Sequence, residues 1–489
     1  MTTLHAVAGY LPGLAQADVK WQTLVFNSGT TGLTVAVPVL RREQMTALAL
    51  RVRQATQVHL KTMRVSAIVA VVDRAVARLL DPDDPYRQQA NQLLPIISGY
   101  DAEMVRLGLT AFFKTFRAPQ LHRFVAEDFA NPKLLDEFQP RTKGGAARAF
   151  GPDLLVHSWA GNVPALPLWS LVCGLLVKAG NIGKLPSAEP LFASLFARLL
   201  AEVHPPLADC MAVVWWKGGD TDQASALYAQ ADTVLAYGSN ASLEEVRRQL
   251  PVTTRFLPYG HKLGFGIVGK AALDTQRGPA TARLAAWDVT RYDQQGCYSP
   301  HVFYVERGGA VSPHEFAQYL ASELCNLQMR FPVRALVLED AAAIAGWRQS
   351  IELQSMALGA ESISEPIGVD GAASCVVYAD RPQTLAPTAL SRNILVVAVD
   401  ALDQVIAQVQ MHKDFLQTAG VATSPAELFR LAALLGAAGV TRITAIGSMT
   451  SPEAGWHHDG RFNLLDLVRM VEIEQSAESA ADAMAPYAD

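Results

Sequence analysis

Short, fully apolar runs alternate with amphipathic segments between residues 153 and 250, and this alternation constrains the fold more than any other feature. Short apolar runs are typical of strands in a parallel sheet, because helices cover both faces of such a sheet. The expected strands are 153–157, 211–216 and 233–237, and the expected helices are 167–179, 223–230 and 243–250. Strand and helix in alternation predict βαβ units, so we expect an α/β fold with a Rossmann-like sheet.

A second α/β region follows residue 260. Apolar runs at 302–306 and 394–399 predict buried strands, and the pattern at 314–328 and 401–412 predicts helices. The segment 439–446 is expected to be a further strand, one that returns to the first sheet. The predicted division is a nucleotide-binding domain in 1–257, regained at about 435–475, a catalytic domain in 258–434, and a frayed tail in 475–489.

The first 150 residues predict a mainly helical layer that covers a sheet. Arg41 to Leu80 places apolar residues at helical spacing, and Ala102 to Phe116 does the same. No side chains in this region suggest chemistry.

Composition excludes several classes of function. A chain of 489 residues predicts two or three domains, and 50% hydrophobic residues predict large buried cores. The net charge of −5, without a basic run, argues against nucleic-acid binding. The most apolar stretch, 160–177, contains Asn162, Pro164 and Pro167, so no membrane span is expected. No signal peptide is visible, and five scattered cysteines without a CxxC pair indicate a reducing, cytoplasmic location.

Two apparent motifs are not expected to form sites. Residues 264–269 match GxGxxG, but the glycines lie inside the strand-like run 262–268, where glycine more often permits close approach of another backbone. His457, His458 and Asp459 suggest a metal site. Adjacent histidines on an extended chain point opposite ways, and no third ligand is suitably spaced, so we expect no metal and a turn at a pocket rim.

Cys297 is the candidate nucleophile. It follows Gly296 in the polar segment 293–300, directly before the expected strand 302–306. A neighbouring glycine lets the backbone N–H turn toward a bound carbonyl, as an oxyanion hole requires. The other four cysteines lie in or beside apolar segments and are expected to be inert. On these residues alone, an ordinary loop cysteine remains the alternative.

Five segments, in order, resemble the aldehyde dehydrogenase superfamily: Ser158-Trp-Ala-Gly-Asn162, Ala179-Gly-Asn-Ile-Gly-Lys-Leu-Pro-Ser187, Tyr237-Gly-Ser239, Tyr259-Gly-His-Lys262 and Gln294-Gln-Gly-Cys297. They cover about residues 150–310. The stretch from Gly455 to Glu474 resembles, more narrowly, the LuxC-type acyl-CoA reductase family. The resemblance implies an aldehyde dehydrogenase-like fold, in which a Rossmann-like nucleotide domain is interrupted by an α/β catalytic domain.

The resemblance also implies roles for individual residues. Cys297 would accept the acyl group, and Asn162 would donate its amide to the oxyanion beside the Cys297 backbone amide. The remaining implied roles concern the cofactor. Lys184 would bind the adenosine ribose, Gly238 and Ser239 would face the pyrophosphate, and Trp159 would line the cofactor cleft.

Departures from the superfamily pattern in two segments are informative. Hydrolytic members carry a glutamate just before Gly-Gly-Lys, where this chain has Pro258 or Tyr259. The second glycine is replaced by His261, a candidate acid/base group. A glutamate that grips the ribose of NAD is replaced by Ser187, which leaves room for a 2′-phosphate, so NADPH is expected in preference to NADH.

The expected function is NADPH-dependent reduction of a fatty acyl-CoA to the aldehyde through a Cys297 acyl-enzyme. An acyl-protein is an alternative donor, an acyl-activating synthetase is a candidate partner, and a homo-oligomer is expected. Three other functions stay open at this point. A CoA-independent aldehyde dehydrogenase would need the missing glutamate, and a cysteine acyltransferase or thioesterase would need no nicotinamide. A non-catalytic complex subunit would not need Cys297 in its loop.

Overall fold

A parallel five-stranded sheet forms the centre of the first unit. The computed structural model describes residues 2–358, 364–367 and 374–486. The sheet order is β10-β9-β6-β7-β8, with all neighbours parallel. The strands are β6 (Leu154–Ser158), β7 (Gly180–Lys184), β8 (Met211–Val214), β9 (Thr233–Tyr237) and β10 (Arg255–Tyr259). The predicted Rossmann-like α/β fold is therefore confirmed.

Helices cover both faces of this sheet. Every residue of α6 (Pro167–Leu176) is buried, which explains why this segment is the most apolar of the chain. The other helices of the unit are α7 (Phe192–Val203), α8 (Thr221–Tyr228) and α9 (Asn240–Gln249). Helix α9 starts three residues before the predicted start at Leu243, because the side chain of Ser239 caps it by accepting the Ser242 N–H.

The first 39 residues differ from the helical prediction. They form a three-stranded sheet of order β1-β3-β2, from β1 (Thr2–Val7), β2 (Lys20–Ser28) and β3 (Thr31–Val39). The predicted helix 41–80 is two helices, α1 (Arg42–Ala55) and α2 (Val65–Leu80), with a π-helical turn at 56–60 between them. The predicted helix 102–116 is found as α4 (Ala102–Lys114).

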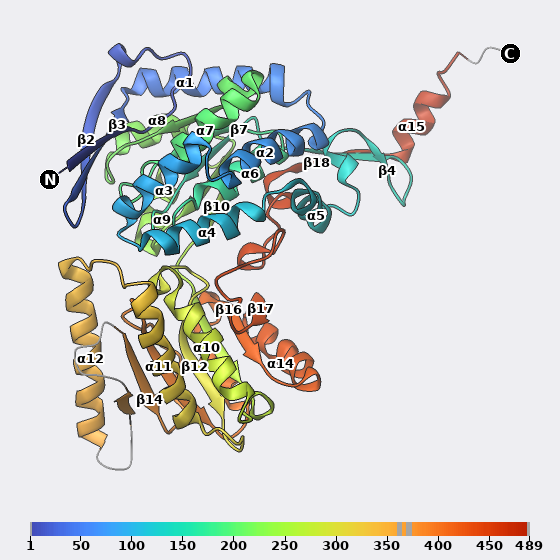
Figure 1. Cartoon of the computed structure of the whole chain (residues 1–489). Helices are drawn as coiled ribbons and strands as arrows, with labels where there is room; N and C mark the ends of the chain where they lie inside the picture. Colours follow the sequence, from blue (N-terminus) through green and yellow to red (C-terminus); the bar gives the residue numbers. More distant parts are fainter. Residues whose placement is uncertain (1, 359–363, 368–373, 487–489) are drawn as a thin grey trace.

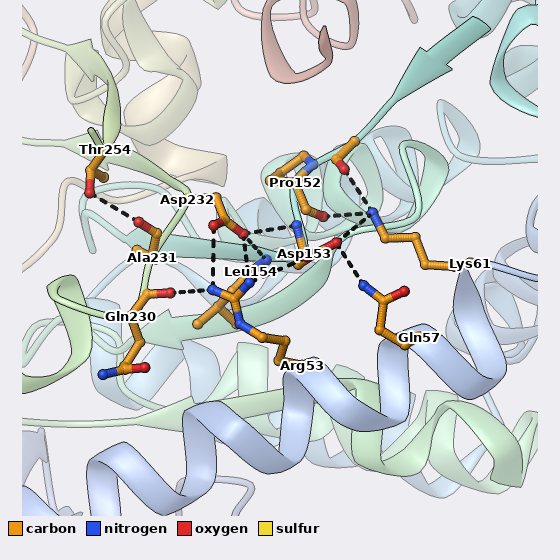
Figure 2. A network of polar contacts seen from close by, with 11 residues as sticks. Arg53, Gln57, Lys61, Pro152, Asp153, Leu154, Gln230, Ala231, Asp232 and Thr254 are labelled. Atoms are coloured by element: carbon orange, nitrogen blue, oxygen red, sulfur yellow. Dashed lines mark hydrogen bonds and ion pairs between the residues drawn. The ribbon is translucent and has the colours of Figure 1, made fainter. Parts of the chain in front are cut away.

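A polar network fastens α1 to the amino ends of β6 and β9 (Figure 2). Arg53 donates to the carbonyl oxygen of Gln230 at 2.6 Å and lies 3.3 Å from the Asp232 carboxylate. Asp232 in turn accepts the backbone N–H of Leu154 at 2.8 Å, and Lys61 lies 3.4 Å from Asp153. These contacts lie at the amino ends of the strands. Ligands of parallel sheets bind at the other edge, beyond the carboxyl ends of the strands.

A seven-stranded sheet forms the second unit, which lies below the first in Figure 1. Its order is β13-β14-β15-β12-β11-β16-β17, and only the β13–β14 pair is antiparallel. The bounds are β11 (Leu263–Val268), β12 (Pro300–Glu306), β13 (Ser364–Ile367), β14 (Cys375–Ala379), β15 (Asn393–Val399), β16 (Leu416–Ala422) and β17 (Arg442–Ala445). Helices α10 (Arg277–Thr290), α11 (Pro313–Arg330), α12 (Leu338–Leu358) and α14 (Pro425–Ala438) flank it.

One strand of the predicted return to the first unit pairs elsewhere. The expectation that 439–446 joins the first sheet was wrong, because β17 pairs in parallel with β16 at the edge of the seven-stranded sheet. The return is made by β18 (Arg469–Ile473), which pairs antiparallel with β5 (Ala146–Phe150). These two strands and β4 (Gln139–Pro140) form a separate three-stranded sheet. Among the described residues, no helix combines the length and the apolar character that crossing a membrane requires.

Gly264 and Gly266 of the GxGxxG match lie inside β11, as predicted, and Gly269 directly follows the strand. A Cβ on Gly264 would stand 2.6 Å from the carbonyl oxygen of Ser299, and one on Gly266 would stand 2.1 Å from the Phe303 ring. Glycine is needed here because β12 lies directly alongside. This close packing positions the loop that precedes β12 and carries Cys297.

Candidate active site

Two cavities meet at Cys297. A cleft of about 620 Å³ lies beyond the carboxyl ends of β6, β9 and β10, and its walls include Asn162, Ser239 and His261. A second cavity, of about 100 Å³, is lined mainly by apolar side chains from α4, the start of α6 and the loop after β17. Cys297 and His458 line both cavities. The thiol can therefore face a polar ligand on one side and an apolar one on the other.

The Cys297 loop is held in an uncommon backbone conformation. Tyr292, Asp293 and Gln294 all have left-handed φ angles, of 51°, 48° and 63°. Such angles cost about 1–2 kcal/mol per residue, so surrounding contacts must hold them. Arg392 donates from Nε to the Asp293 carboxylate at 2.8 Å, with both side chains buried, and the Ser391 N–H donates to the Asp293 carbonyl at 3.0 Å. The loop is thus fixed before any ligand binds.

The Cys297 thiol is protonated at neutral pH. Burial raises its pKa to about 11, and the nearby Asp459 carboxylate acts in the same direction. A hydrogen bond from Gln417 Nε2, 3.5 Å from Sγ, opposes this shift. Since only the thiolate attacks a carbonyl carbon, Cys297 needs a base and local stabilisation of its charge.

Asn162 lies in the same cleft as Cys297, on the loop between β6 and α6. Its Nδ2 donates to the backbone carbonyl oxygen of Gln295 at 2.7 Å, and the Tyr100 hydroxyl donates to the backbone carbonyl oxygen of Asn162 at 2.9 Å. A carboxamide nitrogen carries two hydrogens, so one holds the cysteine loop while the other remains to donate to a ligand.

An aromatic cluster surrounds the thiol. The His458 ring stacks on Tyr259, with centroids 4.6 Å apart, and lies 4.8 Å from the Trp456 ring. Burial lowers the pKa of His458 to about 4, so its imidazole is neutral at pH 7. From the sequence, His458 was predicted to lie in a turn at the rim of a pocket, and no role was predicted for it. Within the described ranges, no group of three or more His, Cys, Asp and Glu side chains is arranged to hold a metal ion.

No role was predicted for Gln417, and Asp459 was predicted only to lie in a turn at a pocket rim. Gln417 is fully buried near the start of β16, and its Nε2 donates to Asp459 Oδ1 at 2.6 Å. Lys262 Nζ lies 3.8 Å from Asp459 Oδ2. No motif marks Gln417, since it and Thr418 are common polar residues in an otherwise apolar strand, 120 positions from Cys297.

His261, the predicted acid/base group, is an exposed residue of the cleft. It lies on the connection between β10 and β11, where the chain passes from one unit to the other. His301 lies in the same cleft, and its pKa is lowered to about 4. Burial is the larger cause, and electrostatic repulsion from His261 is the smaller one. The cleft thus contains two imidazoles besides that of His458.

The residues predicted to bind a cofactor differ in placement. Gly238 and Ser239 line the cleft at the N-terminus of α9. Lys184 ends β7, and burial lowers its pKa. Exposed Ser187 accepts a hydrogen bond from Trp215 Nε1 at 3.2 Å.

Trp159 does not line either cavity. Its side chain is 3% exposed, packs against Gly183, and donates from Nε1 to Ser170 Oγ at 2.9 Å. The expectation of a cleft-lining indole therefore fails, because the ring lies in the core between the sheet and α6.

Comparison with protein families gives one assignment for most of the chain. The family described as acyl-CoA reductase (LuxC) matches residues 60–470. The long-chain acyl-protein thioester reductase of Vibrio harveyi is 26% identical over 359 residues, which are 73% of this chain and 71% of that protein. The protein of the same name from Aliivibrio fischeri is 26% identical over 383 residues, 77% of this chain and 75% of that protein.

Solved structures with the same fold are aldehyde dehydrogenases. NADP-dependent glyceraldehyde-3-phosphate dehydrogenase from Bacillus halodurans, complexed with NADP, gives a TM-score of 0.72 at 12% identity, covering 96% of this chain and 98% of that one. Aldehyde dehydrogenase C from Pseudomonas syringae, complexed with NAD⁺ and octanal, gives 0.71 at 14% identity, covering 95% and 96%. At these identities the likeness establishes the fold.

Proposed function

Because the chain belongs to the acyl-CoA reductase (LuxC) family of oxidoreductases, we propose that it reduces a fatty acyl thioester to the aldehyde, with NADPH, through an acyl-enzyme on Cys297. One observation carries this proposal: Cys297 stands where a wide cleft that contains polar side chains meets a smaller, almost entirely apolar cavity. A reductase of fatty acyl thioesters needs this arrangement, because the reacting carbon joins an apolar chain to a polar donor.

The chain's own residues supply the acylation chemistry. Cys297 Sγ attacks the thioester carbonyl, its proton passes to an imidazole, and the bond between carbonyl carbon and donor sulfur breaks. The free N–H of Asn162 and the backbone N–H of Cys297 stabilise the oxyanion. The donor thiolate leaves with a proton from the same imidazole, which we assign to His261.

The proposed cofactor site combines the N-terminus of α9, which lines the cleft, with Lys184 and Ser187, which line neither cavity. The N-terminus of α9, with Gly238 and Ser239, presents backbone N–H groups suited to a pyrophosphate. A Cβ on Gly238 would meet only Ser242, at 3.4 Å, so the approach is open. The ammonium of Lys184 lies 5.8 Å from the centroid of the Trp216 ring, and no carboxylate stands at Ser187. Bound here, NADPH would supply the hydride that reduces the acyl group.

Ser187→Glu is expected to weaken NADPH binding about ten- to a hundred-fold. A carboxylate beside the 2′-phosphate adds repulsion of about 1–3 kcal/mol. Fluorescence titration with NADPH and NADH measures the effect, and Ser187→Ala controls for the lost hydrogen bond to Trp215. Tighter binding or faster use of NADH by the unaltered protein would refute the NADPH assignment.

The donor is a fatty acyl thioester, either acyl-CoA or an acyl-protein formed by an acyl-activating synthetase. The apolar second cavity supports a fatty chain, and the names of the relatives from Vibrio harveyi and Aliivibrio fischeri favour an acyl-protein. The proposal is tested with NADPH, acyl-CoAs of increasing length and an acylated carrier protein, following NADPH absorbance and aldehyde. Failure of every donor to oxidise NADPH would refute it.

His261→Ala is expected to slow acylation by roughly 10²–10⁴-fold, with little change in NADPH affinity. The reason is that His261 and Cys297 line the same cleft, and imidazole is the side chain most often used for general acid–base catalysis. Rapid-mixing measurement of donor-thiol release reports this step. His458→Gln is the comparison variant, because His458 lines both cavities. Near-normal acylation by His261→Ala, with a large loss in His458→Gln, would transfer the role to His458.

A further inference from the structure

A buried carboxamide contacts the reacting sulfur. Gln417 has no exposed surface, and its Nε2 lies 3.5 Å from Cys297 Sγ and 2.6 Å from Asp459 Oδ1. The amide nitrogen carries two hydrogens, one for each of these neighbours. Its Oε1 accepts from the Thr418 hydroxyl at 3.3 Å. Every polar atom of the Gln417 side chain is therefore engaged.

Asp459 selects the orientation of this carboxamide. An ionised carboxylate only accepts hydrogen bonds, so the Gln417 oxygen turned toward Asp459 would be repelled, whereas the NH₂ group forms a strong charge-assisted bond. Asp459 is itself fixed, since its side chain is 7% exposed, Lys262 lies 3.8 Å away, and its backbone has a left-handed φ of 54°. The second N–H of Gln417 is thereby directed at the cysteine sulfur.

The sulfur needs this donor. Burial and the Asp459 carboxylate both disfavour its ionised form, yet the sulfur carries negative charge when it attacks and when it leaves the acyl group. A hydrogen bond to a charged acceptor stabilises it more than the same bond to the neutral thiol. A carboxamide does not titrate, so it donates at every working pH.

We propose that Gln417 is a catalytic residue whose Nε2–H stabilises the Cys297 thiolate, and that Asp459 is the positioning residue that orients it. The proposal rests on the Cys297 chemistry proposed above. In the step concerned, the S–H bond of Cys297 breaks, the proton passes to the imidazole base, and Gln417 donates a hydrogen bond without giving up its proton.

The test is the pH dependence of Cys297 alkylation by iodoacetamide in the full-length protein, without substrate or cofactor. The rate follows the thiolate fraction, so it rises with pH up to the thiol pKa. Gln417→Leu is expected to raise the apparent pKa by about 1–2 units, and so to slow alkylation about ten- to a hundred-fold at any pH below both values. The exposed thiol of Cys325, read by peptide mass spectrometry in the same sample, is the internal control.

Two Asp459 variants separate its charge from its orienting role. Asp459→Asn keeps an acceptor for Gln417 but removes the negative charge, so the apparent pKa of Cys297 falls. Asp459→Leu removes the acceptor as well, so Gln417 is no longer held. In that background the added change Gln417→Leu then shifts the apparent pKa less than it does alone.

A merely structural role gives a different result. An unchanged alkylation profile in Gln417→Leu overturns the proposal, as does equal slowing at Cys297 and Cys325. If Gln417→Leu does not fold, Gln417→Met takes its place, since it has a similar size, carries no hydrogen-bond donor and is expected to raise the apparent pKa in the same way. Because alkylation needs no acyl donor, a shifted profile in a protein that reduces no thioester would support the Gln417 role while refuting the proposed function.

Discussion

Replacing Cys297 by alanine is expected to abolish acyl reduction and covalent acyl labelling, whereas Cys173→Ala and Cys325→Ala leave both intact. Loss of a covalent nucleophile costs on the order of 10⁴-fold or more. Cys173 lies in the buried helix α6, where burial raises its pKa well above the ordinary value, and Cys325 is exposed on α11, where it lines neither cavity.

Intact-protein mass spectrometry after treatment with acyl-CoA measures labelling, and NADPH absorbance measures turnover. The two other cysteine variants serve as controls for nonspecific acylation. An acyl adduct that persists in Cys297→Ala would remove Cys297 from the mechanism.

The product is expected to be aldehyde, with free acid a minor product. Releasing acid from a cysteine thioester needs a base that activates water, and such a base contributes roughly 10²–10⁴-fold. The superfamily glutamate is replaced here by Pro258, which has no ionisable group, or by Tyr259. Burial raises the pKa of Tyr259 further, so its hydroxyl stays protonated. Asp459 is engaged by Gln417 and Lys262. The acyl-enzyme should therefore persist until hydride or a thiol reaches it.

Gas chromatography of aldehyde and free acid after turnover checks this expectation. The reverse direction is the control: aldehyde with NADP⁺ should turn over appreciably only when CoA or another thiol is present. Rapid oxidation of aldehyde to acid without a thiol would favour the CoA-independent dehydrogenase and would identify His261 or Asp459 as the water-activating base.

The sequence predicts what short segments specify. Three strands of the five-stranded sheet, β6, β8 and β9, appear as apolar runs, and β9 was predicted with its observed bounds. The other two, β7 and β10, were not predicted, because their sequences mix glycine, proline and charged residues with apolar ones. Cys297 stands out because glycine and polar residues flank it within a few positions. The N-terminal sheet was missed, since β2 is largely exposed and shows no clear alternation of buried and exposed residues. Gly439 to Ile446 was correctly read as a strand, but its pairing with β16 depends on residues distant in sequence.

The missed parts of the site share one cause. Gln417, His458 and Asp459 reach Cys297 only because β16 and the turn after β17 fold back onto the cysteine loop. Their residue types are common, and no local spacing distinguishes them from structural residues. The role predicted for Trp159 was mistaken for a different reason. Its position in the sequence, beside a segment that forms the cleft, does not show which way the indole points. In the structure the indole lies in the core, where its N–H donates a hydrogen bond to Ser170.

The central claim is that an acyl group passes from a thioester to Cys297 and leaves as aldehyde. The most direct measurement mixes the protein with acyl-CoA in the absence of cofactor, removes excess donor, and records the intact mass before and after addition of NADPH. We expect one acyl group on the peptide that contains Cys297, lost on addition of NADPH with release of an equal amount of aldehyde. An adduct that never forms, or one that decays to free acid at the same rate with and without NADPH, would contradict it.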